Sequence, residues 1–279
     1  MRELRVELIT EAVADLCASA NTRLPEDVAS ALQRAAECEP WPPARQLLQL
    51  LDENQRIAST TAMPICQDTG MAVVFADVGQ DVHLSGSLSD AVNEGVRKGY
   101  KEAWLRKSIV ADPLRRVNTG DNTPAMLHVR LVEGDQVKLT VAPKGFGSEN
   151  MSRVAMLTPS GGEAAVRNFV LDTVRTAGAN PCPPVILGVG IGSDFEGVAL
   201  LSKRALLLPL PQRNADPYYA NLELQLLDAI NQIGIGPQGL GGQTSCLGLH
   251  ILTAPTHIAG LPVAVNVCCH VCRHETVIL

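Results

Sequence analysis

The sequence predicts a mixed α/β fold in which a helical N-terminal layer packs on a mixed or antiparallel sheet. Through about the first 60 residues, apolar side chains recur at helical spacing. After that, short apolar runs that suit strands alternate with further helical patterns. The 279 residues are 46% hydrophobic, which is enough to bury a substantial core. We therefore expect residues 1–279 to form a single domain, with the helical segment at about residues 1–60.

Three helices are expected in the N-terminal segment. The first has apolar residues at helical spacing from Leu4 to Leu16. The second begins at Pro25, a residue type favoured in the first turn of a helix. The third covers about residues 43–58, where leucines recur.

Strands and helices alternate in the remainder of the chain. Strands are predicted at residues 71–78, 128–132, 136–142, 184–190, 247–253 and 262–269. Helices are predicted at residues 89–105, 162–177, 193–206 and 216–233. The turn Glu133-Gly134-Asp135 predicts that the second and third strands pair as a hairpin. No internal repeat is apparent in the sequence.

Charge and composition exclude several classes of partner. The net charge is −6, no basic run occurs, and aromatic residues make up only 3% of the chain, so nucleic acid is not an expected partner. Charges at Arg2, Glu3, Arg5 and Glu7 interrupt any apolar region of a signal peptide. No apolar run is long enough to span a bilayer. The expectation is a cytoplasmic protein with no membrane partner.

Eight cysteines are then informative, because disulfides are not expected in a reducing cytoplasm. Cys17 and Cys38 lie in helical patterns and are expected to be small buried hydrophobes. Three others lie in loops or at a strand end, where functional sites are usually built. Cys66 begins a polar loop, Cys182 is flanked by prolines, and Cys269 ends the last predicted strand.

Two patterns in the sequence are also compatible with sites of other kinds. Cys269 and Cys272 have C-x-x-C spacing, and His274 follows, so a structural zinc site is one interpretation. It is the weaker one, because no second cysteine pair completes it. A glycine pattern at residues 188–193 follows a strand, but it lacks the third glycine of a dinucleotide fingerprint. In the segment 144–148, glycines leave the backbone bare, which would let a ligand come close.

Two further side chains suit a carboxylate substrate. His257, in a predicted loop, is a candidate acid–base residue or a residue that orients one. Arg106 ends a predicted helix, where it could simply interact with the helix dipole. Alternatively, its planar guanidinium could bind a carboxylate with two hydrogen bonds.

Several motifs together resemble the class I iron–sulfur fumarate hydratase and L(+)-tartrate dehydratase family. The resemblance runs from about Pro64 to His274. Its motifs are Cys66-Gln67-Asp68-Thr69-Gly70, Val117-Asn118-Thr119-Gly120, Lys144-Gly145-Phe146-Gly147-Ser148, Cys182-Pro183-Pro184, Gly234-Ile235-Gly236-Pro237-Gln238-Gly239 and Pro262-Val263-Ala264-Val265.

This resemblance implies a [4Fe–4S] cluster held by Cys66, Cys182 and Cys269. One iron then has no protein ligand and can act as a Lewis acid with an open position. Between the adjacent Cys268 and Cys269, strand alternation allows only one to face the cluster. The resemblance selects Cys269, and Cys272 is the more serious competitor.

The resemblance also implies roles for the remaining site residues. Asp68 is expected to protonate the departing hydroxyl group. His257 is expected to contact substrate or handle a proton. Arg106 is expected to bind a substrate carboxylate, while Gln67 and the backbone of Gly147 contact the substrate.

A partner chain is implied as well. In fused members of the family a second domain follows, whereas this chain ends at Leu279. The resemblance therefore implies an alpha subunit that works with a separate beta subunit, as an alpha2beta2 assembly. The expected reaction is the hydration of fumarate to malate, and tartrate and methylfumarate are the alternative substrates.

Overall fold

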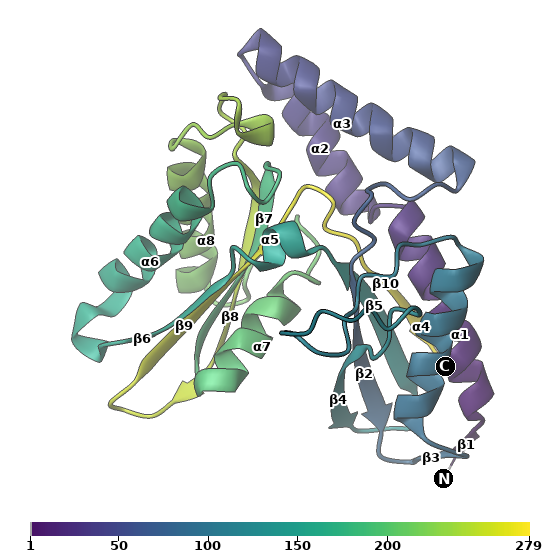
Figure 1. Cartoon of the computed structure of the whole chain (residues 1–279). Helices are drawn as coiled ribbons and strands as arrows, with labels where there is room; N and C mark the ends of the chain where they lie inside the picture. Colours follow the sequence, from purple (N-terminus) through teal and green to yellow (C-terminus); the bar gives the residue numbers. More distant parts are fainter. Residues whose placement is uncertain (1) are drawn as a thin grey trace. The chain divides into compact units, whose positions relative to one another are not determined.

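The computed structural model describes residues 2–279 and confirms the mixed α/β class (Figure 1). The chain forms two compact units. Unit 1 comprises Met1–Pro25, Gln55–Phe146 and Arg273–Leu279, and unit 2 comprises Glu26–Asn54 and Gly147–Cys272. The assignment of residues 1–279 to a single domain stays a prediction.

The three N-terminal helices are confirmed as α1 (Val6–Thr22), α2 (Glu26–Cys38) and α3 (Pro42–Thr61). α1 belongs to unit 1 and α2 to unit 2. The two cysteines predicted to be buried in these helices differ. Cys17 is buried, as predicted, but Cys38 is exposed. Cys38 is the last residue of α2, and it is not among the buried residues of that helix, which are Val28, Ala31, Leu32 and Ala36.

Unit 1 contains a four-stranded mixed sheet with helices on one face (Figure 1). In spatial order the strands are β10 (Glu275–Ile278), β5 (Val137–Lys144), β2 (Met71–Gly79) and β4 (Met126–Val132). The covering helices are α1 and α4 (Leu88–Glu102). Two short strands of unit 1, β1 (Arg2–Leu4) and β3 (Val82–Leu84), pair in parallel and form a separate two-stranded sheet.

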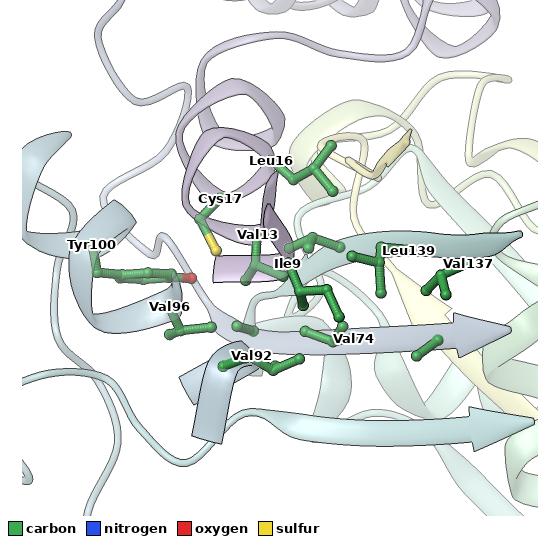
Figure 2. Packing of buried hydrophobic residues seen from close by; sticks show 14 of the residues in the cluster. Ile9, Val13, Leu16, Cys17, Val74, Val92, Val96, Tyr100, Val137 and Leu139 are labelled. Atoms are coloured by element: carbon green, nitrogen blue, oxygen red, sulfur yellow. The ribbon is translucent and has the colours of Figure 1, made fainter. Parts of the chain in front are cut away.

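The core of unit 1 depends on alternation along β2 and on two glycines of α4. Alternate β2 residues from Ala72 to Val78 face the helices and are buried with apolar residues of α1, α4 and β5 (Figure 2). A Cβ at Gly95 or Gly99 would lie 2.6 Å from a backbone oxygen of α1. The two helices can therefore pack closely only because these positions lack side chains.

The predicted hairpin between the second and third strands is wrong. β2 lies between β4 and β5, parallel to the former and antiparallel to the latter. The turn instead crosses the end of β2, where Gly79 N–H donates to Gln136 O (2.8 Å) and Asp81 N–H donates to Gly134 O (3.0 Å). β2 is almost wholly buried, so both of its edges need hydrogen-bonding partners, and this arrangement supplies them.

Unit 2 contains a second four-stranded mixed sheet. In spatial order the strands are β6 (Arg153–Leu157), β9 (Leu261–Cys268), β7 (Val185–Ser193) and β8 (Cys246–Thr256). One face packs against α6 (Gly162–Ala177) and α8 (Pro217–Asn231), and the other against α7 (Phe195–Ala205). Helices α2 and α3 form a small cluster of their own with Leu247 of β8.

The glycine pattern of residues 188–193 is explained by helix packing. A Cβ at Gly188 would lie 1.9 Å from Ser202 O, and one at Gly190 would lie 2.4 Å from Val198 O, both in α7. These glycines let α7 lie directly on β7. The helix expected from Ser193 begins at Phe195, because the Asp194 side chain accepts the N–H of Gly197 and caps it.

The two sheets share one arrangement of three strands, although the sequence shows no repeat. Each has a central strand, β2 or β7, whose neighbours are the next two strands of its sheet in the chain, one parallel and one antiparallel. The segment before the central strand and the segment after its antiparallel neighbour therefore meet at one end of each sheet. Met71 pairs with Lys144 in unit 1, and Ile186 pairs with Cys268 in unit 2.

Among residues 2–279, no helix is both long enough and apolar enough to cross a membrane.

One buried histidine makes the stability of unit 2 depend on pH. His250 of β8 is 1% exposed, and its Nδ1 lies 3.9 Å from the buried carboxylate of Glu223. Burial, and secondarily the charge of Arg213, lowers the pKa of His250 from 6.5 to about 4. The folded protein therefore holds this imidazole neutral, while the unfolded chain takes up a proton below pH 6.5.

We predict that the free energy of unfolding falls by about 2 kcal/mol between pH 7 and pH 5 because of this histidine. The contribution is present above the unfolded pKa and is lost as pH falls toward the folded one. Urea titrations of the wild type and His250→Gln at both pH values measure it. Parallel pH dependence in the two proteins would contradict the assignment.

Candidate active site

In unit 1, the loop before β2 carries Cys66, Gln67 and Asp68. Buried Ile65 anchors its start by donating its N–H to Asn21 O (3.0 Å). Gly70 ends it in the left-handed region, at φ +77°, and a Cβ there would lie 2.8 Å from the Lys144 backbone. The loop is thus fixed at both ends, and it leaves Cys66 half-buried and Gln67 exposed.

The carboxylate of Asp68 is oriented by two backbone N–H groups. Oδ1 accepts from Gly70 (3.0 Å), and Oδ2 accepts from Phe146 (2.9 Å). A Cβ at Gly145 would lie 3.2 Å from Oδ2, so the loop after β5 approaches this closely because residue 145 is glycine. Asp68 is therefore held in one orientation before any substrate binds.

Arg273 holds the backbone of the same loop. Its side chain is 4% exposed, and it donates to the carbonyl oxygen of Asp68 and to that of Pro143 (3.4 Å). The first carbonyl belongs to the loop before β2, and the second lies near the end of β5. Nothing in the sequence marked Arg273, because its partners are backbone atoms distant in the chain.

Cys66 has a donor at its sulfur. The N–H of Asp68 points at Sγ (3.4 Å), and Sγ donates to Gln67 Oε1 (3.3 Å). A backbone N–H directed at sulfur is an interaction that a thiolate or a metal-bound sulfur accepts. The arrangement therefore suits a metal ligand.

Arg106 lies on a segment tied to this loop. Its carbonyl oxygen accepts from Thr69 Oγ1 (3.0 Å), while its side chain is exposed. Asn118 of the predicted motif at residues 117–120, together with Asn122 just after it, holds the segment in place. Asn118 donates to Lys107 O (3.0 Å), and the buried Asn122 accepts from Ser108 N–H (2.7 Å). The Asn-Thr-Gly motif thus acts on the backbone around Arg106.

Tyr100 is a second residue whose role could not be predicted from the sequence. It is fully buried in α4, and its hydroxyl donates to the carbonyl oxygens of Thr69 (2.8 Å) and Gly70 (3.0 Å). Burial raises the pKa of Tyr100, so the hydroxyl keeps its proton and remains a donor. The tyrosine therefore fixes the end of the loop that carries Asp68.

In unit 2, Cys182 and Cys269 lie at the same end of the sheet. Cys182 precedes β7, is exposed, and has a left-handed backbone, at φ +54°. Cys269 directly follows β9 and is half-buried. A hydrogen bond between His270 Nδ1 and Cys182 O (3.0 Å) links the two segments.

The other cysteines of this region are enclosed by protein. Cys246, Cys268 and Cys272 are buried. Cys272 Sγ donates to Leu206 O (3.7 Å), and burial raises the pKa of Cys246 to about 12. The three predicted ligands are thus more accessible than these neighbours.

Side chains alternate between the two faces of the last long strand, β9. Val263, Val265 and Val267 all lie in the core with α6 and α8. The strand ends at Cys268, one residue earlier than predicted. For the alternative zinc site, Cys272 is already buried and hydrogen-bonded. No group of three or more His, Cys, Asp or Glu side chains is placed to hold a single metal ion anywhere in residues 2–279.

Gly147 and His257 lie in different parts of unit 2. Gly147 is exposed, and a Cβ there would lie 3.7 Å from the carbonyl oxygen of Asn180, just before Cys182. His257 is exposed in the turn between β8 and β9. The length of β9, roughly 25 Å, separates it from Cys269. The structure therefore does not bring His257 to the cysteines of its own unit.

Comparison with known proteins identifies the class. Residues 10–278 match the fumarate hydratase (Fumerase) family. The chain is 39% identical over 269 residues to a Methanocaldococcus jannaschii protein provisionally named L(+)-tartrate dehydratase subunit alpha, covering 94% of each chain. It is 34% identical over 282 residues to the L(+)-tartrate dehydratase subunit alpha of Escherichia coli K12, covering 100% of this chain and 93% of that one. The chain therefore belongs to the fumarate hydratase family and is a hydro-lyase.

We predict that Gly145→Ala lowers kcat by about tenfold to a hundredfold, the loss of one hydrogen bond to a charged group. The new Cβ would push against Asp68 Oδ2 and disturb its bond with Phe146. Residue 145 is outside the left-handed region, so alanine strains no backbone there. Steady-state kinetics and a melting curve test this together.

Gly260→Ala is the matched control, because its Cβ would meet only ordinary contacts at 3.7–3.8 Å. Full activity of Gly145→Ala, or an equal loss in both variants, would count against the orientation of Asp68 by this loop.

Proposed function

We propose that this chain is the alpha subunit of a two-subunit hydro-lyase that interconverts fumarate and malate. The observation that carries the proposal is the Asp68 carboxylate, held by two backbone N–H groups on the loop that also presents Cys66 and Gln67. A hydro-lyase needs a fixed proton donor beside the leaving hydroxyl group. The family match over residues 10–278 supports the reaction class.

We propose further that Cys66, Cys182 and Cys269 hold a [4Fe–4S] cluster with one iron that lacks a protein ligand. Three thiols on loops, with a backbone N–H directed at Cys66 Sγ, suit such a group. When bound, the cluster supplies a Lewis acid with an open position.

The other candidate site residues would bind and protonate substrate. Asp68 delivers a proton to the departing hydroxyl group in the dehydration direction. The Arg106 guanidinium binds a carboxylate of the substrate with two parallel hydrogen bonds. Gln67 and the Gly147 backbone supply further polar contacts.

His257 lies apart from the two cysteines of unit 2. Its predicted role as a substrate-contacting or proton-handling residue stands. Because it lies at the far end of β9 from Cys269, it would not act directly beside Cys182 and Cys269 of its own copy of unit 2.

L(+)-tartrate is the second candidate substrate, since the two relatives named above are tartrate dehydratase subunits. Fumarate, tartrate and methylfumarate are all short dicarboxylates and present the same pair of anionic groups. Arg106 would bind each of them through a carboxylate. Assays with all three substrates on the same preparation discriminate among them.

A separate beta subunit would complete the active site. The relatives are named as alpha subunits, which supports a partner of this kind. An alpha2beta2 assembly and a cytoplasmic location are the corresponding expectations for this chain.

We predict that Cys66→Ser, Cys182→Ser and Cys269→Ser each lose most of the iron and acid-labile sulfide after anaerobic reconstitution. Cys268→Ser and Cys272→Ser should keep most of it, because both thiols are buried. Iron and sulfide analysis per chain is the measurement. Cys38→Ser is the matched control, as an exposed cysteine on α2.

Loss of iron from Cys272→Ser together with its retention by Cys269→Ser would transfer the third ligand to Cys272. Zinc without sulfide in the wild type would overturn the cluster itself.

We predict that Arg106→Lys raises KM for the dicarboxylate by roughly tenfold to a hundredfold, because lysine cannot make two parallel bonds. The kinetics of the chain assembled with its partner measure this. Arg115→Lys, on the same long loop, is the control and should leave KM unchanged. An unchanged KM for Arg106→Lys would leave Arg106 with a structural role alone.

A further inference from the structure

The motif at residues 234–239 has no role in the proposed function, yet it contacts the backbone next to Cys182. Gln238 donates its backbone N–H to Pro183 O (2.7 Å) and its side-chain Nε2–H to the same oxygen (2.9 Å). Gln238 lies in the left-handed region, at φ +55°, which turns both donors to one side. One carbonyl, directly after the Cys182 residue, thus receives two hydrogen bonds from one residue.

The segment around Cys182 depends on such contacts because it has few donors of its own. Pro181, Pro183 and Pro184 have no N–H. The N–H of Cys182 donates to Ala179 O (3.1 Å), which makes a tight local turn. The carbonyl groups are therefore the means by which the rest of unit 2 can fix this segment.

The loop that presents Gln238 is itself rigidly held. A Cβ at Gly236 would lie 1.8 Å from Gly241 O, and one at Gly239 would lie 2.3 Å from Ala179 Cβ, so the loop is compact and lies on the turn before Cys182. Its far end is fixed by the buried carboxylate of Glu39. That carboxylate accepts from the N–H of Gln243 (3.1 Å) and from the N–H of Thr244 (2.9 Å).

His270 provides the second attachment. Its Nδ1 bonds to Cys182 O at 3.0 Å, and a carbonyl acceptor requires that Nδ1 carry the proton. His270 immediately follows Cys269, so this bond links the backbone of Cys182 to the side chain of the residue next to Cys269. Consecutive carbonyls, those of Cys182 and Pro183, are thereby held from two different segments of unit 2.

We propose that Gln238 and His270 are positioning residues that fix the spacing of Cys182 and Cys269 before any cluster is bound. The inference rests on the proposed function, because it treats these two thiols as cluster ligands. Both residues would act through the backbone beside the two cysteines and not through contact with substrate. We call these hydrogen bonds of Gln238 and His270 to the carbonyls of Pro183 and Cys182 the clamp. The clamp would hold two of the three ligand segments in place, so that little conformational change of the chain is needed when the cluster inserts.

Three variants test the clamp. His270→Ala removes the bond to Cys182 O. His270→Asn keeps a donor close to the position of Nδ1. Gln238→Asn keeps a residue that tolerates the left-handed backbone, but its amide is one methylene too short to reach Pro183 O. His83→Ala, an exposed histidine of β3 in unit 1, is the control.

Hydrogen exchange on the cluster-free chain is the first measurement. In His270→Ala and Gln238→Asn, the amides of Cys182 and Val185 should exchange about three- to tenfold faster, as expected for one lost hydrogen bond. His270→Asn should restore wild-type rates within about twofold. Wild-type exchange rates in His270→Ala, or no rescue by asparagine, would overturn the clamp.

The rate at which a chelator removes iron from the anaerobically reconstituted protein is the second measurement. We expect about three- to tenfold faster release in His270→Ala and Gln238→Asn, with melting temperatures close to the wild type. An unchanged release rate would overturn the role in positioning ligands. If the wild type binds no iron and sulfide, the proposed function fails, while hydrogen exchange still decides whether the backbone clamp exists.

Discussion

The site depends on how one buried strand in each unit satisfies both of its edges. β2 and β7 are apolar and almost wholly buried, so every N–H and C=O along them must be paired. Each is paired by a parallel strand on one side and an antiparallel strand on the other. This constraint brings the segment before the central strand and the segment after the antiparallel strand to the same end of the sheet. Cys66 and Asp68 meet the Gly145 loop in this way in unit 1, and Cys182 meets Cys269 in unit 2.

Side chains that donate hydrogen bonds to backbone carbonyl groups then fix the conformation of the loops at these sheet ends. Tyr100, Asn122 and Arg273 each donate to a carbonyl of the loop that carries Asp68 or of its neighbour. Positions occupied by glycine, which has no side chain, are just as important for the approach of these loops. Gly70 and Gly145 allow the segment after β5 to approach the loop before β2 to within ordinary contact distance. Polar groups of the site are therefore oriented by rigid backbone, which is the arrangement that catalysis by a fixed proton donor needs.

Much of this fold could be predicted from the sequence, because its elements are regular. The helix at Gly162–Ala177 and the strand from Met71 are examples in which periodicity alone was sufficient. The hairpin was wrong because a turn signal such as Glu133-Gly134-Asp135 does not reveal that a third strand lies between its two arms. Motifs in the sequence indicated Cys66, Asp68 and Cys182 as candidates. They could not indicate His270 or Arg273, since those residues act on carbonyl groups that are far away in the chain.

The central claim is that this chain presents Asp68 and three cysteines as one half of a cluster-dependent hydro-lyase. The most direct measurement is iron and acid-labile sulfide content together with fumarate hydration, made anaerobically on the chain alone and on the chain assembled with its partner subunit. The account predicts that both samples contain iron and acid-labile sulfide in a one-to-one ratio, and that only the assembled sample hydrates fumarate. Full turnover by the chain alone, or turnover by an assembly that contains no sulfide, would contradict it.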